Sequence, residues 1–155
     1  MAASAQARRT APPGWPVVTP RIVARDAHAL VAFICDLFGA RAAYEPDTPA
    51  IVSLGDSKLM VSDAGARGPA NAFLYVYVGD ADAAYRHALE LGATSIEPPF
   101  DTPYGDRRCM FDDPWGNTWQ VATYREGAGE TDVTASASDV GSGVEAQRQA
   151  SPQAT

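Results

Sequence analysis

Two stretches of similar pattern decide the fold: Asp26–Ala40, DAHALVAFICDLFGA, and Asp80–Ala93, DADAAYRHALELGA. Each begins with an aspartate, which can cap a helix, and closes with a glycine, which can adopt the left-handed conformation that stops one. Between these ends, apolar residues recur every three or four positions, as on the buried stripe of a helix. The sequence therefore predicts helices over Ala27–Phe38 and Ala81–Leu91.

The similarity continues beyond the helices. Tyr44–Pro46 matches Ile96–Pro98, so the match runs through the helix and into the following strand. A self-match at a spacing of about half a domain predicts a duplicated unit. Further on, the Gly55–Asp56 turn matches Gly105–Asp106 by sequence but Gly116–Asn117 by strand count. We prefer the strand count, because the second unit has a longer loop before its third strand.

Short runs of strand character, bounded by turn residues, surround each helix. Each unit is predicted to contain one strand, one helix and three further strands. The predicted strands of the first unit are Val17–Ala24, Ala42–Glu45, Ile51–Leu54 and Lys58–Ser62; those of the second are Asn71–Val78, Ser95–Pro98, Arg107–Phe111 and Thr118–Tyr124. The fold class is predicted to be α+β, with two βαβββ modules over about residues 17–65 and 70–125.

Composition changes at both ends of this predicted domain of residues 17–125. Residues 1–16 are rich in Ala and Pro and predict a flexible leader, from which Trp15 can pack onto the domain. Residues 126–155 are dominated by small and polar residues, which cannot bury enough surface to offset the entropy of ordering. We expect them to form a disordered tail.

Charge and hydrophobicity exclude several classes of partner. The net charge is −7 and Lys and Arg are not clustered, which disfavours nucleic acid and is compatible with a cationic ligand. No run approaches the ~20 apolar residues of a membrane span, and the N-terminus lacks the apolar core of a signal peptide. The protein is predicted to be cytoplasmic. Cys35 and Cys109 lack the spacing of a redox or zinc pair and predict free buried thiols.

A family resemblance rests on four segments, of which the last is the most specific because it forms a turn into the final strand. They are Thr19–Ala27, Leu37–Ala40, Tyr104–Arg107 and Asp113–Gln120. Together they resemble the vicinal oxygen chelate superfamily, which includes glyoxalase I, extradiol dioxygenases, fosfomycin-resistance enzymes and bleomycin-resistance proteins. The resemblance implies a U-shaped mixed sheet made by the two modules, with helices on its convex side and a ligand cleft on its concave side. It also implies a homodimer.

Strand alternation predicts which residues line this cleft. Along Asn71–Val78 the aliphatic residues share one face and the aromatic residues the other. We expect the aromatic face to line the cleft; alternatively, its rings fill a second core layer. Trp119 alternates oppositely to the cleft residues and is predicted to lie in the core under the second helix. The predicted ligand-binding residues are Thr19, Arg21, Met60, Phe73, Tyr75, Tyr77, Tyr104, Arg107, Trp115 and Gln120.

Some of these residues have alternative interpretations. Asp106 and Arg107 lie where the loop enters the seventh strand, near the mouth of the cleft, and they form either a structural ion pair or turn contact, or a ligand contact. Arg21 and Lys58 either meet an anionic group of the ligand or extend into solvent. Trp115, in a turn, either stacks on the ligand or lies in a subunit interface.

The resemblance also gives the places where metal-dependent members hold a divalent ion. They fall near Thr19, Met60, Phe73 and Gln120. A thioether and a phenyl ring do not bind a divalent cation, so one amide and one hydroxyl remain. The two histidines, His28 and His87, lie on the predicted helices outside the apolar stripes and are expected to face solvent. We predict no metal and no other cofactor.

These observations favour a binding protein that takes up a flat or hydrophobic small molecule, in analogy to drug sequestration by bleomycin-resistance proteins. The rival hypothesis is an enzyme. It is either a metal-independent lyase or isomerase that uses a tyrosine or Asp106 as acid or base, or a glyoxalase-type enzyme with other metal ligands. A third hypothesis is a structural or regulatory module. No serine or cysteine has an evident base partner, and no phosphate-binding glycine loop is present.

Overall fold

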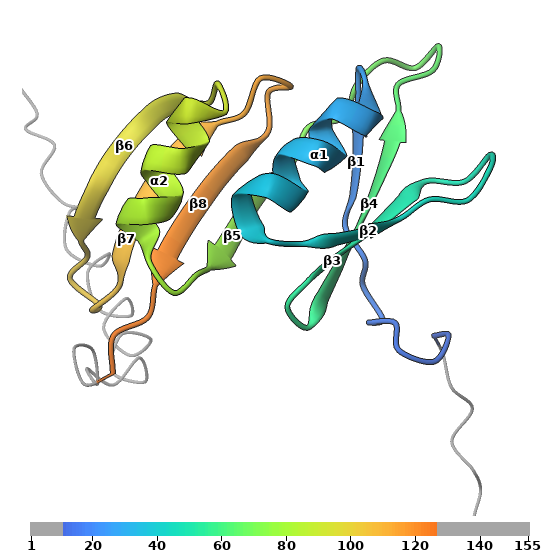
Figure 1. Ribbon diagram of the computed structural model, residues 1–155. Helices are drawn as coiled ribbons and strands as arrows, with labels where there is room; N and C mark the ends of the chain where they lie inside the picture. Colours follow the sequence, from blue (N-terminus) through green and yellow to red (C-terminus); the bar gives the residue numbers. More distant parts are fainter. Residues whose placement is uncertain (1–10, 127–155) are drawn as a thin grey trace, which may run out of the picture.

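The computed structural model describes residues 11–126, which form two modules of the same element order (Figure 1). Module 1 contains β1 (Arg21–Ala24), α1 (Ala27–Phe38), β2 (Arg41–Ala43), β3 (Ala50–Leu54) and β4 (Ser57–Asp63). Module 2 contains β5 (Phe73–Tyr77), α2 (Ala81–Glu90), β6 (Thr94–Asp101), β7 (Arg107–Asp112) and β8 (Thr118–Thr123). The predicted α+β class with two βαβββ modules is confirmed. The leader up to residue 10 and the tail from residue 127 lie outside the described residues.

Each module forms its own four-stranded mixed sheet. The strand orders are β1-β4-β3-β2 and β5-β8-β7-β6. In both sheets the first and last strands of the module pair in parallel, and the other pairs are antiparallel. The equivalent orders confirm that the Gly55–Asp56 turn corresponds to Gly116–Asn117, as counted by strands.

The helix ends follow the predicted capping chemistry. Asp26 accepts a hydrogen bond from the backbone N–H of Ala29 at 3.0 Å, and Asp80 accepts one from Ala83 at 2.9 Å. Gly39 ends α1 with φ 64°, a conformation that glycine adopts without strain. Both helices lie on the same side of the two sheets (Figure 1). The apolar stripe of α1 is buried there against β1, β3 and β4.

Helix α1 joins the two modules. It contacts α2, and its Phe38 ring lies 5.3 Å from the ring of Trp119, centroid to centroid. Among residues 11–126, no strand of one sheet contacts a strand of the other. Trp119 is fully buried, so its predicted core position is confirmed, but the ring that packs on it belongs to α1 and not to α2. Helix α1 therefore packs against module 2 through α2 and Trp119, whereas the two sheets do not meet in the described residues.

The strand β6 differs most from the prediction. It continues to Asp101, where the sequence predicted a loop from Pro99, and its pairing with β7 shifts register on both sides of Glu97. The two prolines of this strand have no backbone N–H, so they interrupt the ladder without ending the strand. In the described part of the chain, neither helix has the length and apolar character needed to cross a membrane.

Candidate functional site

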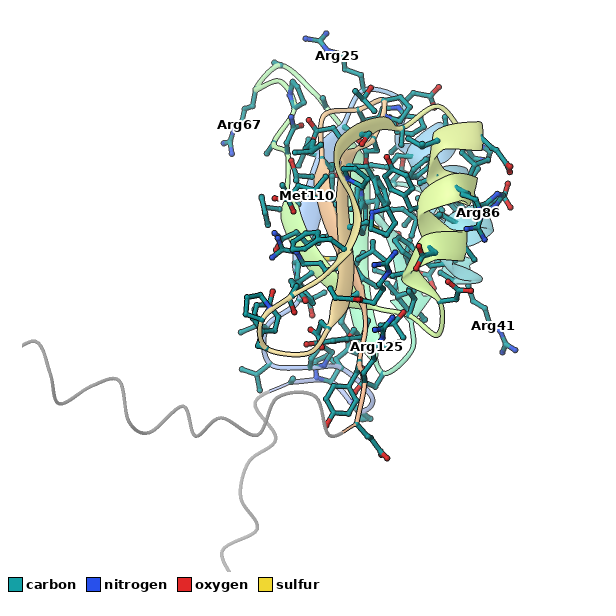
Figure 2. All side chains as sticks on the ribbon, turned by 90° about the vertical axis from the view of Figure 1, so that its left-hand side faces the viewer. Arg25, Arg41, Arg67, Arg86, Met110 and Arg125 are labelled. Carbon is teal, nitrogen blue, oxygen red and sulfur yellow. The ribbon has the colours of Figure 1, made fainter. Side chains whose placement is uncertain are left out.

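The side of the module 2 sheet that faces away from α2 is called here the open face. Residues alternate between the two sides of β7: Cys109 and Phe111 are buried on the helix side, so Arg108 and Met110 lie on the open face. Figure 2 shows Met110 and α2 on opposite sides of the sheet. No helix of the described residues covers the open face, so its side chains are available to a ligand or to another protein surface.

Strand register arranges the open-face residues in rows across the sheet. Tyr77 lies beside Ala122, which pairs with Arg108; the small Ala122 is fully buried between these larger neighbours. The next row places Gln120 between Tyr75 and Met110. The open face therefore combines aromatic rings from β5 with polar side chains from β7 and β8.

A tyrosine–aspartate cluster, made by Tyr75, Tyr77 and Asp106, occupies one end of the open face. Both phenol hydroxyls donate hydrogen bonds to the same oxygen, Asp106 Oδ2, at 2.9 and 3.0 Å. Their rings lie 5.2 Å apart, inclined by 53°. Burial and the hydrogen bond to Asp106 raise the pKa of Tyr75, and the bond to Asp106 followed by burial raises that of Tyr77. The phenols are therefore held in their protonated form.

The loop between β6 and β7 holds Asp106 in place. The Asp106 backbone N–H donates to Thr102 Oγ1 at 3.0 Å, and the Thr102 backbone N–H donates to the Asp106 carbonyl at 2.8 Å. The Asp106 residue is only 4% exposed. Its carboxylate is thus fixed by the loop and lies behind the two tyrosines.

Arg108 organises the neighbouring part of the open face. Its guanidinium donates to Glu97 at 2.8 Å and to the Tyr104 hydroxyl at 3.1 Å, and it lies 5.0 Å from the Phe100 ring centroid. Burial lowers the pKa of Arg108, but the hydrogen bond to Glu97 and nearby negative charge outweigh it, so that the pKa is raised overall. Arg108 is therefore a cation that already has a carboxylate partner.

The aromatic residues of this face are exposed. Phe73 is 64% exposed, Tyr77 61% and Tyr75 40%, and Phe100 and Tyr104 are exposed as well. The alternative in which the β5 rings fill a second core layer is wrong for the single chain. Contiguous exposed aromatic surface of this kind marks a ligand or protein binding site.

Two hollows adjoin the sheets. A groove of about 840 Å³ runs along β5, between module 2 and the β3–β4 turn of module 1, and Tyr75 and Tyr77 contribute to its wall. A shallower hollow of about 520 Å³ lies on module 1, lined by Trp15, Thr19 and Met60. The predicted leader residue Trp15 thus contacts the domain, where the Lys58 amine lies 5.6 Å from its ring centroid.

The predicted ligand-binding residues fall into two separate groups. Phe73, Tyr75, Tyr77 and Gln120 share the open face of module 2, and Tyr104 reaches it through Arg108. Thr19, Arg21 and Met60 belong to module 1, where Arg21 donates to the Ser62 hydroxyl at 3.1 Å. A single chain does not bring the two groups together, since strands of the two sheets are not in contact in the described region.

Two predicted ligand residues point elsewhere. Arg107 lies on the helix side of β7 and makes a two-pronged ion pair with Asp82 of α2, with both distances 2.9 Å. Trp115 packs edge-on against Phe33 of α1, with 5.7 Å between centroids. Strand alternation and the position of α1 turn both side chains toward the helices. Of the interpretations left open for Arg107, the structure shows an ion pair, with Asp82 as the partner. A ligand contact by either residue stays a prediction.

Sequence reasoning missed Arg108, Met110 and Glu97. The signal was present for the first two: Cys109 and Phe111 are the apolar residues of β7, so the alternate positions face the other side. The position of Glu97 carried no such signal, because the register shifts in β6 break the alternation.

The family-implied metal positions do not suit a divalent ion. Thr19, which precedes β1, and Met60 belong to module 1, whereas Phe73 and Gln120 belong to module 2, and together they offer one hydroxyl and one amide oxygen. Within residues 11–126, no group of three or more His, Cys, Asp or Glu side chains has an arrangement that could hold a metal. At these four positions, the donor set of the described residues therefore does not fit a divalent ion.

The histidines lie on the helix side, away from the open face. His28 stacks on Tyr44 with 5.7 Å between centroids. His87 was predicted to face solvent, and its side chain is 37% exposed; in addition, its Nε2 atom lies 3.2 Å from Asp36 of α1 and its Nδ1 atom 3.4 Å from Glu90. Hydrogen bonds to Asp36 and then Glu90 raise the pKa of His87. This histidine links the two helices across the module boundary.

A family model for the glyoxalase/bleomycin resistance protein/dioxygenase superfamily matches residues 16–121, nearly all of both modules. The chain belongs to this superfamily. The resemblance inferred from the sequence is thereby confirmed at the level of the superfamily. No curated protein matches the sequence.

Solved structures of the same fold include TioX from Micromonospora sp. ML1, which is 21% identical with a TM-score of 0.59 over 70% of this chain and 98% of that one. A superfamily enzyme from Burkholderia phytofirmans PsJN is 21% identical, with a TM-score of 0.58 over 68% of this chain and 95% of that one. A superfamily protein from Nocardioides is 22% identical, with a TM-score of 0.56 over 76% and 89%. At these identities the likeness shows the fold alone.

Proposed function

We propose that this superfamily member binds a small, flat organic molecule on the open face of module 2 and releases it unchanged. The observation that carries the proposal is the exposed aromatic surface around the buried carboxylate of Asp106. Ligand sites typically combine aromatic walls with a few fixed polar groups, as this face does. Bleomycin resistance, named in the family description, provides a functional analogy of sequestration.

The proposed binding is independent of a metal. Thr19, Met60, Phe73 and Gln120 offer too few oxygen ligands for a divalent ion, and the histidines lie on the helix side. The ligand is held instead by ring faces and by hydrogen bonds to side chains of the open face. No other cofactor takes part.

Binding is favoured over acid–base catalysis by the state of the tyrosines. A general base works best with a pKa near the operating pH. The pKa of Tyr75 is raised above its usual value, chiefly by burial and the bond to Asp106, and its hydroxyl hydrogen is already donated. The form of the rival lyase or isomerase in which a tyrosine acts as the base requires the opposite shift.

We further propose that a second copy of this chain completes the cleft with its module 1. The face of module 1 away from α1 carries Arg21 and Lys58 and no carboxylate on the paired strand positions, whereas the open face of module 2 carries Asp106, Glu97 and Asp112 against one arginine. The two faces are thus complementary in charge. Strand β5 pairs with β8 alone, so its other edge is free in the described chain. Such a dimer brings Thr19 and Met60 to the ligand.

The binding function is tested on the purified full chain. We expect stoichiometric metal to be absent by elemental analysis, chelators to leave the melting temperature unchanged, and members of a small-molecule library to raise it. Mass spectrometry of the bound compound should return it unaltered. Stoichiometric metal, or conversion of the compound, contradicts the proposal and favours the enzyme; a library without any stabilising member favours a structural or regulatory module.

The dimer is tested by sedimentation equilibrium. The double variant Arg21→Glu/Lys58→Glu should shift the wild-type dimer toward monomer, because it places like charges across the interface. The matched control Arg86→Glu lies on the outer side of α2 (Figure 2) and should leave the dimer intact. A monomeric wild-type chain refutes the proposal. The cytoplasmic location and the lack of nucleic-acid and membrane partners remain predictions.

A further inference from the structure

We propose that the open face of module 2 selects flat organic cations over anions, because Asp106 fixes the hydroxyls of Tyr75 and Tyr77 as hydrogen-bond acceptors. This inference rests on the proposed binding function and names its ligand class. Asp106 acts as a positioning residue, since it lies behind the tyrosines and reaches the ligand through them.

The argument begins with the hydrogens of the two phenols. A tyrosine hydroxyl has one hydrogen to donate and two lone pairs to accept with. Both hydroxyls point their hydrogen at Asp106 Oδ2, which as a carboxylate oxygen can only accept. The hydroxyl sites left for a ligand are therefore lone pairs. Tyr75 and Tyr77 are 40% and 61% exposed, so a ligand on the open face meets these two residues.

Charge leads to the same conclusion. Within the described residues, Asp106 has no Lys, Arg or His side chain within ion-pair distance, so phenols alone stabilise its charge. The one arginine of the open face, Arg108, is matched by Glu97 at 2.8 Å. A ligand cation is the natural counter-charge for this face, whereas a ligand carboxylate would meet oxygen lone pairs.

The aromatic rings add a third, independent preference. The faces of tyrosine and phenylalanine rings carry negative electrostatic potential and attract cations. Tyr75 and Tyr77, inclined to each other at 5.2 Å, form an angled wall for a flat molecule. Phe100 already shows this attraction, since it holds the guanidinium of Arg108 over its ring. A flat cation with N–H groups at its edge satisfies both the rings and the hydroxyl oxygens.

Three fluorescent tricyclic probes of similar shape test the inference on the full chain at neutral pH: 9-aminoacridine, a cation; acridone, which is neutral; and 9-anthracenecarboxylate, an anion. Fluorescence titration should give a dissociation constant at least tenfold lower for the cation than for the anion, with acridone between them. Equal or tighter binding of the anion overturns the inference but leaves the binding function standing. If none of the three binds, the binding function fails together with it.

The variant Asp106→Asn tests the role of the carboxylate. If the amide oxygen takes the place of Oδ2, it still accepts from both phenols and only the negative charge is lost; if the NH₂ group takes that place, it donates to the phenols, whose hydrogens then turn toward the ligand. We expect the cation-to-anion preference to fall at least fivefold. The control Glu90→Gln removes the same charge on the helix side, where the side-chain hydrogen bond of Glu90 within the described residues is to His87, and it should change the preference less than twofold. A uniform loss for all three probes would indicate a merely structural role and overturn the assignment.

A second variant keeps the test independent of the folding of Asp106→Asn. Tyr77→Phe removes one accepting hydroxyl from a residue that is 61% exposed, and it preserves the ring. The cation should bind at least threefold more weakly, while the anion is unaffected or binds more tightly. Unchanged binding of the cation contradicts the acceptor role of this hydroxyl.

Discussion

The replacement Asp113→Asn tests a buried carboxylate that accepts four hydrogen bonds. Asp113 lies in the turn before β8 and is 5% exposed. Its Oδ1 atom accepts from the backbone N–H groups of Trp115 and Asn117, both at 2.9 Å. Its Oδ2 atom accepts from Asn117 Nδ2 at 2.8 Å and from Trp119 Nε1 at 2.9 Å. Asparagine has the same shape, but one of its two terminal atoms is a donor.

The amide is therefore mismatched in either orientation. Whichever oxygen the NH₂ group replaces, it faces two donors, and Asn117 cannot flip without giving up the bond from the Ala72 N–H to its Oδ1 atom. A buried donor without a partner costs about 1–3 kcal/mol, so two cost about 4 kcal/mol. For a domain of this size that corresponds to a loss of about 15 °C in melting temperature.

Urea unfolding followed by circular dichroism measures this difference directly. The neighbouring Asp112→Asn is the matched control, because Asp112 accepts only from Thr118 Oγ1, at 2.6 Å, and an amide oxygen can take over that bond. The control should cost less than about 1 kcal/mol. If Asp113→Asn is as stable as the control, the reasoning from donors and acceptors is wrong.

Three further predictions concern other local contacts of the fold. Gly116→Ala should destabilise the fold by about 1–2 kcal/mol, because φ at Gly116 is +89° and an added Cβ would lie 2.6 Å from the side-chain amide of Asn71. The control Gly65→Ala, where an added Cβ meets open space, should leave the stability in urea unfolding unchanged. Because the pKa of His87 is raised in the folded protein, protonated His87 stabilises the fold below the unfolded pKa of about 6.5, and this stability is lost as the pH rises through the folded pKa. The variant Asp36→Asn should lower the pKa of His87 in an NMR titration. An unchanged pKa contradicts the contact between His87 and Asp36. Burial raises the pKa of Cys109 to about 11, so a thiol reagent at pH 8 should label it only after unfolding, and rapid native labelling would be inconsistent with its burial.

Much of the fold could be predicted because its determinants are local. The caps Asp26 and Asp80 and the stop at Gly39 act through hydrogen bonds and backbone angles within a few residues. Alternation along β5 likewise separated the aromatic from the aliphatic face, since successive side chains of a strand point to opposite sides. The candidate site was predictable to the same extent: Tyr75, Tyr77 and Gln120 share one face of paired strands.

Alternation along one strand does not predict which distant helix or strand contacts its side chains. Arg107 was expected to contact the ligand. Its side chain instead points to the helix side of β7, where Asp82 of α2 lies close enough to form an ion pair with it. Trp115 was expected in an exposed turn, but α1 of the other module covers it. The register shifts in β6, which place Glu97 beside Arg108, depend on how two strands pair around prolines.

The sequence by itself thus determined the elements, their duplication and the superfamily, because capping, periodicity and turn chemistry act over short distances along the chain. Only the tertiary structure decided that the two sheets do not meet, and that Asp106 holds two tyrosines from a separate strand. Such contacts depend on the relative placement of segments about 30 residues apart, 31 for Tyr75 and 29 for Tyr77, and no local pattern encodes that placement.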